Sequence, residues 1–248
     1  MKTISRQASG HGPMGRSRHV PSLFINRMKP KFPSVRITIF VCLFILAVYT
    51  TVWGAVGCDL NDPDRDVARL FPDSTGYKTI YTSIQKKGGE KLMSTVETRL
   101  GDKFKGLYET IDVPYTIYEI FANKKKIGYI HGVNQKGQFG GIQVFLVLDL
   151  QGTIRGFYIQ KMTSQYAAKL RDTKFGKQFI GLTIKDFGLY NAISGKSSGK
   201  VEAIKNPAPE VEIDFMAALR ATKKNLILMD EFVFSAEANP SAQEVPKK

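Results

Sequence analysis

Apolar and polar residues alternate with a two-residue period along several stretches of the chain, a pattern typical of β-strands. In the most regular stretch Ile142, Val144 and Leu146 fall on one face, while Gln143 and Asp149 fall on the other. The predicted strands span residues 76–84, 115–123, 126–134, 141–150 and 154–162. An Asn-Lys-Lys turn and a Gln-Gly turn separate neighbouring strands. The pattern therefore predicts an antiparallel meander with one buried face.

Helical patterns occur before and after this block of strands. At residues 60–72 Asp62 is suited to cap a short helix and Pro63 to occupy its first turn. Short helical pieces are predicted at 165–172 and 173–182, and residues 90–112, which lack a clear pattern, are expected to form a strand and a loop. A final helix is predicted at 210–229, with an apolar stripe of Val211, Phe215, Ala218, Leu219, Thr222, Leu226 and Met229. The fold class is therefore α+β: an antiparallel sheet meander packed by a C-terminal helix.

A membrane-spanning segment is predicted ahead of this domain. Residues 37–57 form an uncharged run of 21 residues, and about 20 helical residues cross a bilayer core. We therefore expect a basic, disordered cytoplasmic tail at 1–36 and one transmembrane helix at 37–57. A linker with a short helix at 58–75, the folded domain at 76–234 and a flexible tail at 235–248 complete the predicted organisation.

The charge of the chain sets the predicted orientation. The net charge is +14, and residues 1–36 contribute +8 because they hold eight Lys or Arg and no Asp or Glu. Positive charge beside an apolar run indicates the cytoplasmic side, so we expect an inner-membrane protein of a bacterium with its C-terminal domain in the periplasm. No interleaving of aromatic and basic residues favours nucleic acid as a partner.

The cysteines and histidines limit the possible chemistry. Cys42 lies inside the apolar run and Cys58 at its end, which leaves no disulfide framework and no cysteine-based metal site. The sequence Ala-Val-Gly-Cys ending at Cys58 resembles a bacterial lipoprotein cleavage site, so lipidation of Cys58 is the alternative to a transmembrane anchor. His131 is the single histidine of the domain, and its strand-like surroundings favour packing over catalysis. We therefore expect no metal and no catalytic activity of its own.

Two glycine-bearing segments follow one another in the second half of the chain. Residues 136–160 fit a pattern of the type G-x-G-G-x-I-x-V-x-V-x-D-x-x-G-x-I-x-G through Gly140, Gly141, Asp149, Gly152 and Gly156. Residues 163–182 match a second pattern in position through Lys169, Phe175, Gln178, Phe179 and Gly181. Over about residues 65–232 the order and spacing resemble the FMN-binding domain of the Rnf and sodium-pumping NADH:quinone oxidoreductase subunits and of the related nitrous-oxide-reduction regulator.

The chain departs from that family at the flavin attachment site. The family has an S-G-A-T motif just before its last helix, and the threonine carries FMN through a phosphoester bond. Asn-Pro-Ala-Pro stands at residues 206–209 here, and residues 202–213 contain no Ser or Thr. Glu210 and Glu212 place negative charge where the phosphate would lie. The glycines of the family's E-T-P-G-L-G loop are also missing, so we expect no covalent flavin.

Three functions from different classes remain open. We predict first a membrane-anchored structural or accessory subunit of a bacterial membrane redox complex, with the membrane and the other protein subunits as partners and no cofactor. The second is an electron carrier that holds FMN non-covalently. The resemblance then implies that FMN contacts Phe139, Gly140, Gly141, Thr163, Tyr166, Lys169 and Asn206. The third is an exported binding module without a cofactor.

Overall fold

The computed structural model of the chain describes residues 57–235, which belong to one compact unit. The predicted tails and the apolar run as far as residue 56 lie outside the described residues. Within residues 57–235, no helix combines the length and the apolar character that crossing a membrane requires.

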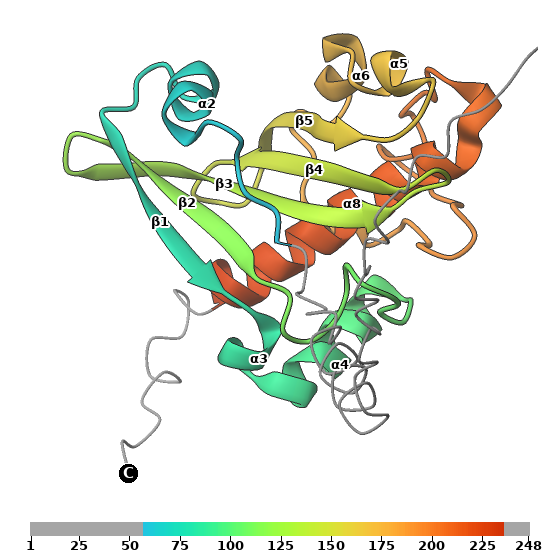
Figure 1. The fold of residues 1–248 in the computed structure, drawn as a ribbon, viewed down its shortest axis with the longest axis horizontal. Coiled ribbons are helices and arrows are strands. Elements are labelled where there is room, and N and C mark those ends of the chain that lie inside the picture. Colours follow the sequence, from blue (N-terminus) through green and yellow to red (C-terminus); the bar gives the residue numbers. More distant parts are fainter. Residues whose placement is uncertain (1–56, 236–248) are drawn as a thin grey trace, which may run out of the picture. The chain divides into compact units, whose positions relative to one another are not determined.

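A five-stranded antiparallel sheet forms the centre of the domain (Figure 1). Its strands are β1 (Gly76–Thr82), β2 (Tyr115–Ala122), β3 (Lys125–Lys136), β4 (Gly141–Leu148) and β5 (Ile154–Met162). They lie side by side in chain order, each antiparallel to the next. The predicted meander is therefore confirmed, and all five predicted strands are present.

The turns explain why consecutive strands pair. Between β2 and β3 Asn123 has a φ of 56°, a left-handed conformation that asparagine tolerates better than most residues. Between β4 and β5 Gly152 has a φ of 77°, and Asp149 Oδ1 accepts hydrogen bonds from the backbone N–H groups of Gln151 and Thr153. Both turns are thus held by the residue types that the predicted hairpins require.

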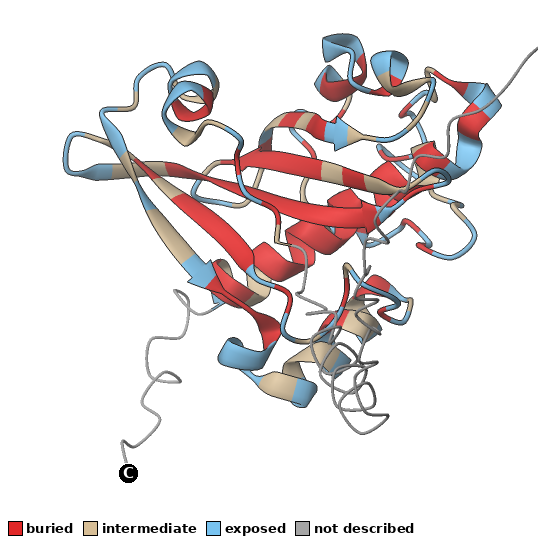
Figure 2. Ribbon diagram, in the orientation of Figure 1, coloured by how far each residue is buried: buried red, intermediate tan, exposed pale blue. Residues whose placement is uncertain are grey.

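The C-terminal helix α8 (Glu212–Met229) crosses one face of the sheet and contacts β3 and β4. Every residue from Ala217 to Met229 is buried, and Figure 2 shows this helix in red along most of its length. The sheet covers one side of α8, while α4 and α7 contact it elsewhere. The predicted apolar stripe therefore describes only part of a helix that is enclosed from several sides.

The opposite face of the sheet is covered by residues 58–71, which include α2 (Pro63–Leu70). This helix begins as predicted, with Pro63 in its first turn and Asp62 Oδ1 accepting from the backbone N–H of Arg65 at 3.2 Å. The segment completes a second apolar cluster of Cys58, Leu60, Val67, Tyr118, Ile120, Ile130, Phe145 and Val147. The prediction of one buried face is therefore wrong, because the segment expected to be a linker packs on the second face.

The remaining helices surround these layers. They are α3 (Ile84–Lys87), α4 (Gly89–Leu100), α5 (Ala167–Leu170), α6 (Thr173–Lys177), α7 (Ile184–Phe187), the 3₁₀ turn η1 (Pro209–Val211) and the π-helical η2 (Asp230–Phe234). The expectation of a strand within residues 90–112 is wrong, since α4 buries Val96 and Leu100 on one face and ends at Gly101 with a φ of 75°. Such a left-handed glycine is a common end of an α-helix.

Candidate functional site

The residues predicted to contact a flavin fall into two different regions of the domain. The first is an open hollow of about 510 Å³ lined by Phe139, Thr163, Ser164 and Gln165. Gly140 lies beside it with a φ of 153°, and a Cβ on this glycine would be 3.2 Å from Thr163 Cβ. Phe139 is 49% exposed, so its ring is free to contact a bound molecule. The structure thus brings together three of the seven predicted residues, Phe139, Gly140 and Thr163.

The space beside the neighbouring Gly141 is filled by another side chain. A Cβ on this residue would lie 2.7 Å from the hydroxyl oxygen of Tyr108, in the loop that follows α4. The close approach that this glycine permits is therefore made by the protein itself.

Tyr166, Lys169 and Asn206 belong to the second region, near the start of α8. Lys169 Nζ lies 2.9 Å from Glu210 Oε1 and 5.3 Å from the centre of the Tyr166 ring. The Asn206 side chain accepts a hydrogen bond from the backbone N–H of Ala208 at 2.8 Å. The hydrogen bond from Lys169 holds the pKa of the Glu210 carboxyl below its usual value. The polar side chains of this junction are thus bonded within the domain, Lys169 to Glu210 and Asn206 to the backbone of Ala208.

A second open hollow, of about 520 Å³, adjoins this junction. Its lining is basic on balance: Lys169, Asp172, Lys174, Phe175, Gln178, Lys205 and Pro207. The Gln178 side chain accepts from the backbone N–H of Lys205 at 2.8 Å and donates to its carbonyl at 3.2 Å. These two bonds hold the backbone at Lys205, ahead of α8, without any ligand.

The first turn of α8 carries a buried carboxylate. Asp214 is 1% exposed, and its Oδ1 accepts from the backbone N–H of Gln138 at 2.7 Å. Its Oδ2 has no hydrogen-bond partner among residues 57–235. This bond ties the loop between β3 and β4 to the start of α8. The Asp214 carboxyl group itself occupies the helix end that would otherwise attract an anion.

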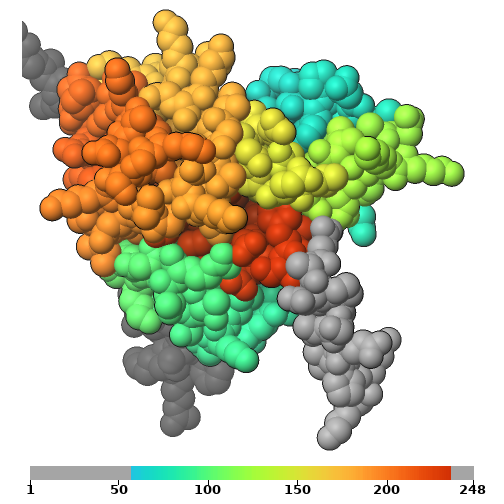
Figure 3. Space-filling view, turned by 180° about the vertical axis from the view of Figure 1, so that it is seen from behind, coloured from blue at the N-terminus to red at the C-terminus, as the bar shows by residue number. Residues whose placement is uncertain are grey.

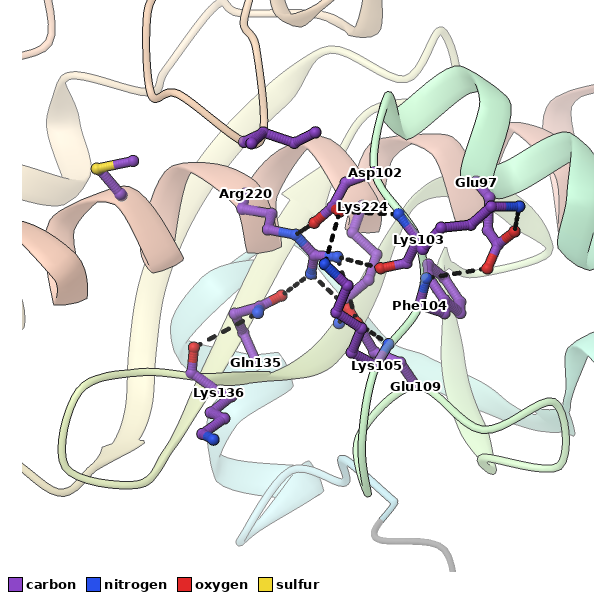
Figure 4. A network of polar contacts seen from close by, with 12 residues as sticks. Glu97, Asp102, Lys103, Phe104, Lys105, Glu109, Gln135, Lys136, Arg220 and Lys224 are labelled. Carbon is purple, nitrogen blue, oxygen red and sulfur yellow. Dashed lines mark hydrogen bonds and ion pairs between the residues drawn. The ribbon is translucent and has the colours of Figure 1, made fainter.

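A network of buried charges, which sequence reasoning missed, lies between α8 and the loop after α4 (Figure 4). Glu109 is 4% exposed and lies between Arg220 and Lys224, which are 8% and 0% exposed. Glu109 Oε1 accepts from Lys224 Nζ at 2.7 Å and from an Arg220 nitrogen at 2.5 Å. One carboxylate thus pairs with two cations from consecutive turns of α8.

Further polar groups complete the network. Arg220 also donates to Asp102 at 2.9 Å and to the side chain of Gln135 at 2.7 Å. Lys224 Nζ donates to the carbonyl of Asn134 at 2.8 Å, and Glu109 Oε2 accepts from the backbone N–H of Lys105 at 2.9 Å. The network therefore joins α8, the end of β3 and the loop 101–113.

The pKa values in the network follow from burial and pairing. Burial favours neutral Glu109, but the charges and hydrogen bonds of Lys224 and Arg220 outweigh this and hold its pKa below the usual value. Burial lowers the pKa of Lys224, and the nearby Glu109 offsets only part of that effect. These charges are enclosed and paired, so removal of one partner would leave an uncompensated buried charge.

The signal for this network was visible in part. Arg220 directly follows the striped residue Leu219, and Lys224 comes two positions after the striped residue Thr222. A lysine within an apolar helix indicates either an exposed face or a buried partner. The partner, Glu109, is 115 residues away in a segment without a clear pattern, so the sequence alone did not identify it.

His131 is fully buried, in the packing role expected from its strand. Its Nδ1 lies 2.8 Å from Asn225 Oδ1, while Asn225 Nδ2 donates to the His131 carbonyl at 2.9 Å. Because the amide oxygen only accepts, Nδ1 carries the proton in this pair. Burial lowers the pKa of His131 to about 4, so the ring is neutral at pH 7.

Cys58, the predicted lipidation residue, is 1% exposed. Burial and the nearby charge of Asp59 raise the pKa of its thiol far above the usual value. Packing around the sulfur is tight, since a Cβ on Gly132 would lie 2.9 Å from Cys58 Sγ. A lipid on this sulfur would displace the apolar cluster around it.

Among residues 57–235, no group of three or more His, Cys, Asp or Glu side chains is arranged to hold a metal ion. No family model matches the chain, and no curated protein matches it. The choice among the three functions therefore depends on the two hollows and the junction before α8.

Proposed function

We propose that the chain is a membrane-tethered accessory subunit of a bacterial membrane redox complex, built on a fold like that of FMN-binding domains but without covalent flavin. In this proposal the domain lies in the periplasm, tethered to the inner membrane, and its partners are the other subunits of the complex. The observation that carries the proposal is the junction at 206–210, where no hydroxyl is present, Asn206 accepts from the backbone N–H of Ala208, and Glu210 pairs with Lys169.

The chemistry of attachment supports this reading of the junction. A phosphoester bond needs a serine or threonine oxygen, and residues 202–213 have neither. Pro207 and Pro209 also lack the backbone N–H groups with which a helix start holds a phosphate. Glu210 and Glu212 add negative charge at the same point, which repels an anion.

An absorbance spectrum of the detergent-solubilised full chain tests the proposal. We expect a colourless protein, with no flavin in the supernatant after denaturation and none attached to the precipitated chain. Free FMN added to a parallel sample provides the recovery control. A yellow preparation whose flavin stays with the denatured chain would refute the proposal.

Non-covalent FMN is the second candidate, and the hollow beside Phe139 favours it. An exposed aromatic ring beside Gly140 and Thr163 is a suitable surface for stacking a flat ring system. Titration of FMN with the full chain, followed by flavin fluorescence, distinguishes the two. Saturable quenching that is lost in Phe139→Ala but kept in Leu150→Ala, at a residue 39% exposed beyond the other end of β4, would establish this candidate. The accessory-subunit proposal predicts no saturable quenching in any of the three proteins.

Mild affinity purification from the native membrane tests the partners. We expect subunits of a membrane redox complex to co-purify in constant proportion. Recovery of the chain without such subunits would favour the third function, an exported binding module.

A further inference from the structure

The positive charge of the described domain is concentrated in one part of the chain, residues 155–205, here called the basic segment. It contains ten Lys or Arg residues and three Asp or Glu residues, a net charge of +7. The other described residues contain 16 Lys or Arg and 17 Asp or Glu. Figure 3 shows much of this segment, amber to orange, as one continuous part of the surface.

Most of this charge is not used within the domain. The ten basic side chains are all exposed. Within residues 57–235, only Arg155, Lys169 and Lys200 of the ten make an ion pair. The other seven make none: Lys161, Arg171, Lys174, Lys177, Lys185, Lys196 and Lys205. The acidic residues of the segment therefore neutralise only a small part of its charge, and a large positive potential faces the solvent.

Two large aliphatic side chains protrude from the same segment. Leu189 is 61% exposed and Ile193 is 67% exposed, while Tyr190 and Ala192 between them are buried. Lys196 and Lys200 follow in the loop and are exposed.

Hydrogen bonds hold this loop in place. The Tyr190 carbonyl accepts from Lys223 Nζ at 2.7 Å, and the Tyr190 hydroxyl donates to the Met216 carbonyl at 3.2 Å. The Asn191 side chain accepts from the backbone N–H groups of Ile193 and Ser194 at 3.0 and 2.9 Å. Folding thus fixes the aliphatic side chains on the outside, where water contact is unfavourable.

We propose that the basic segment lies on an anionic bilayer surface, with Leu189 and Ile193 entering the headgroup region and the surrounding lysines contacting lipid phosphates. Apolar side chains among lysines are the usual composition of a surface that binds anionic membranes. The inference rests on the proposed membrane tether. The apolar run of this tether ends at Gly57, whose carbonyl accepts a hydrogen bond from Asn134 at 2.7 Å. The bilayer would then be within reach of the domain without a linker.

The composition of the segment favours a bilayer over an acidic protein. Protein interfaces are enriched in arginine and aromatic residues and depleted in lysine. The basic segment has eight lysines and two arginines, and its large exposed apolar residues are Ile180, Leu189 and Ile193, none of them aromatic. Lysine stems and aliphatic tips suit a fluid surface that needs no fixed complementary shape.

Tryptophan fluorescence in the full chain tests this inference. Trp53 is the single tryptophan, so Trp53→Phe provides a silent background for Ile193→Trp. Tyr81→Trp is the matched control, since Tyr81 is 65% exposed on β1, at the sheet edge opposite to β5. Each protein is reconstituted into vesicles of phosphatidylcholine, or of equal parts phosphatidylcholine and phosphatidylglycerol, with brominated acyl chains as quenchers.

We expect the indole at position 193 to be blue-shifted and quenched in the anionic vesicles alone, and the indole at position 81 to be unchanged. Salt at about 1 M, where the Debye length is about 3 Å, should remove the effect, as should Lys196→Glu with Lys200→Glu. Flotation with the vesicles but without quenching at position 193 would overturn this inference and leave the tether intact. Failure to float would contradict the tether itself. Protection of position 193 by an acidic protein in place of lipid would also overturn the inference.

Discussion

Replacing Glu109 by glutamine removes the carboxylate that contacts both Arg220 and Lys224. The change keeps the shape of the side chain and leaves Lys224, which is 0% exposed, without a counter-charge. Breaking a buried ion pair on one side typically costs about 3–5 kcal/mol. We therefore expect the free energy of unfolding to fall by about 3–5 kcal/mol at pH 7.

The pH dependence of this variant gives a second measurement. Burial already lowers the pKa of Lys224, and loss of Glu109 lowers it further. The unfolded chain then binds a proton at Lys224 more tightly than the folded chain does, so stability rises with pH. The deficit relative to the wild type should therefore narrow as the pH rises from 7 towards the lysine's unfolded pKa of about 10.4.

Urea unfolding of the detergent-solubilised full chain, followed by far-ultraviolet circular dichroism, measures the change. Glu210→Gln is the matched control, because its pair with Lys169 is about half exposed on both sides and should contribute little to stability. Combining Glu109→Gln with Lys224→Met should cost less than the sum of the two single changes. A loss of under about 1 kcal/mol in Glu109→Gln, equal to that of the control, would refute the energetic role assigned to the network.

Three further predictions follow from other buried positions. The pKa of His131 is about 4 in the folded chain and near 6.5 in the unfolded chain. The free energy of unfolding should therefore fall by about 3 kcal/mol as the pH falls from 6.5 to 4. His131→Gln should flatten this part of the pH profile, and an unchanged profile would contradict the assignment. Gly132→Ala places a Cβ 2.5 Å from a ring carbon of Phe145 and should lower stability by about 1–3 kcal/mol. Gly76→Ala, with no heavy atom within 4 Å, should be nearly neutral. Equal melting temperatures of the two variants would count against the packing at Gly132. In a Cys42→Ser chain, Cys58 should react with a thiol reagent only after denaturation, since its thiol is 1% exposed; rapid reaction of the folded chain would contradict this burial, and the absence of a free thiol after denaturation would establish lipidation.

Local patterns were sufficient for most of the sheet. Asn123 and Gly152 have the backbone conformations that their turns need, so short-range chemistry alone predicted the hairpins. The error over the second face came from β4, where Phe145 and Val147 are buried as well as Val144 and Leu146. A run of consecutive apolar residues indicates burial on both sides, but it does not identify the covering segment.

The candidate site was predicted less completely than the fold. The sequence indicated that Phe139, Gly140 and Thr163 belong to related motifs, and the structure places them at one hollow. It did not indicate that Tyr108 fills the space beside Gly141 or that Lys169 pairs with Glu210. Each of these contacts joins residues more than 30 positions apart, where no local pattern links them.

The sequence by itself determined the antiparallel meander, the cap of α2, the final helix and the absence of a hydroxyl before it, because these depend on residue type and short-range spacing. Only the tertiary structure decided which charges are buried and with what partners. Lys224 could be solvated or enclosed according to its sequence alone, and it is enclosed because Glu109 and the Asn134 carbonyl meet it from two other segments. Taking a charge out of water is unfavourable unless such partners are present, and chain segments distant in sequence supply them only when the fold is complete.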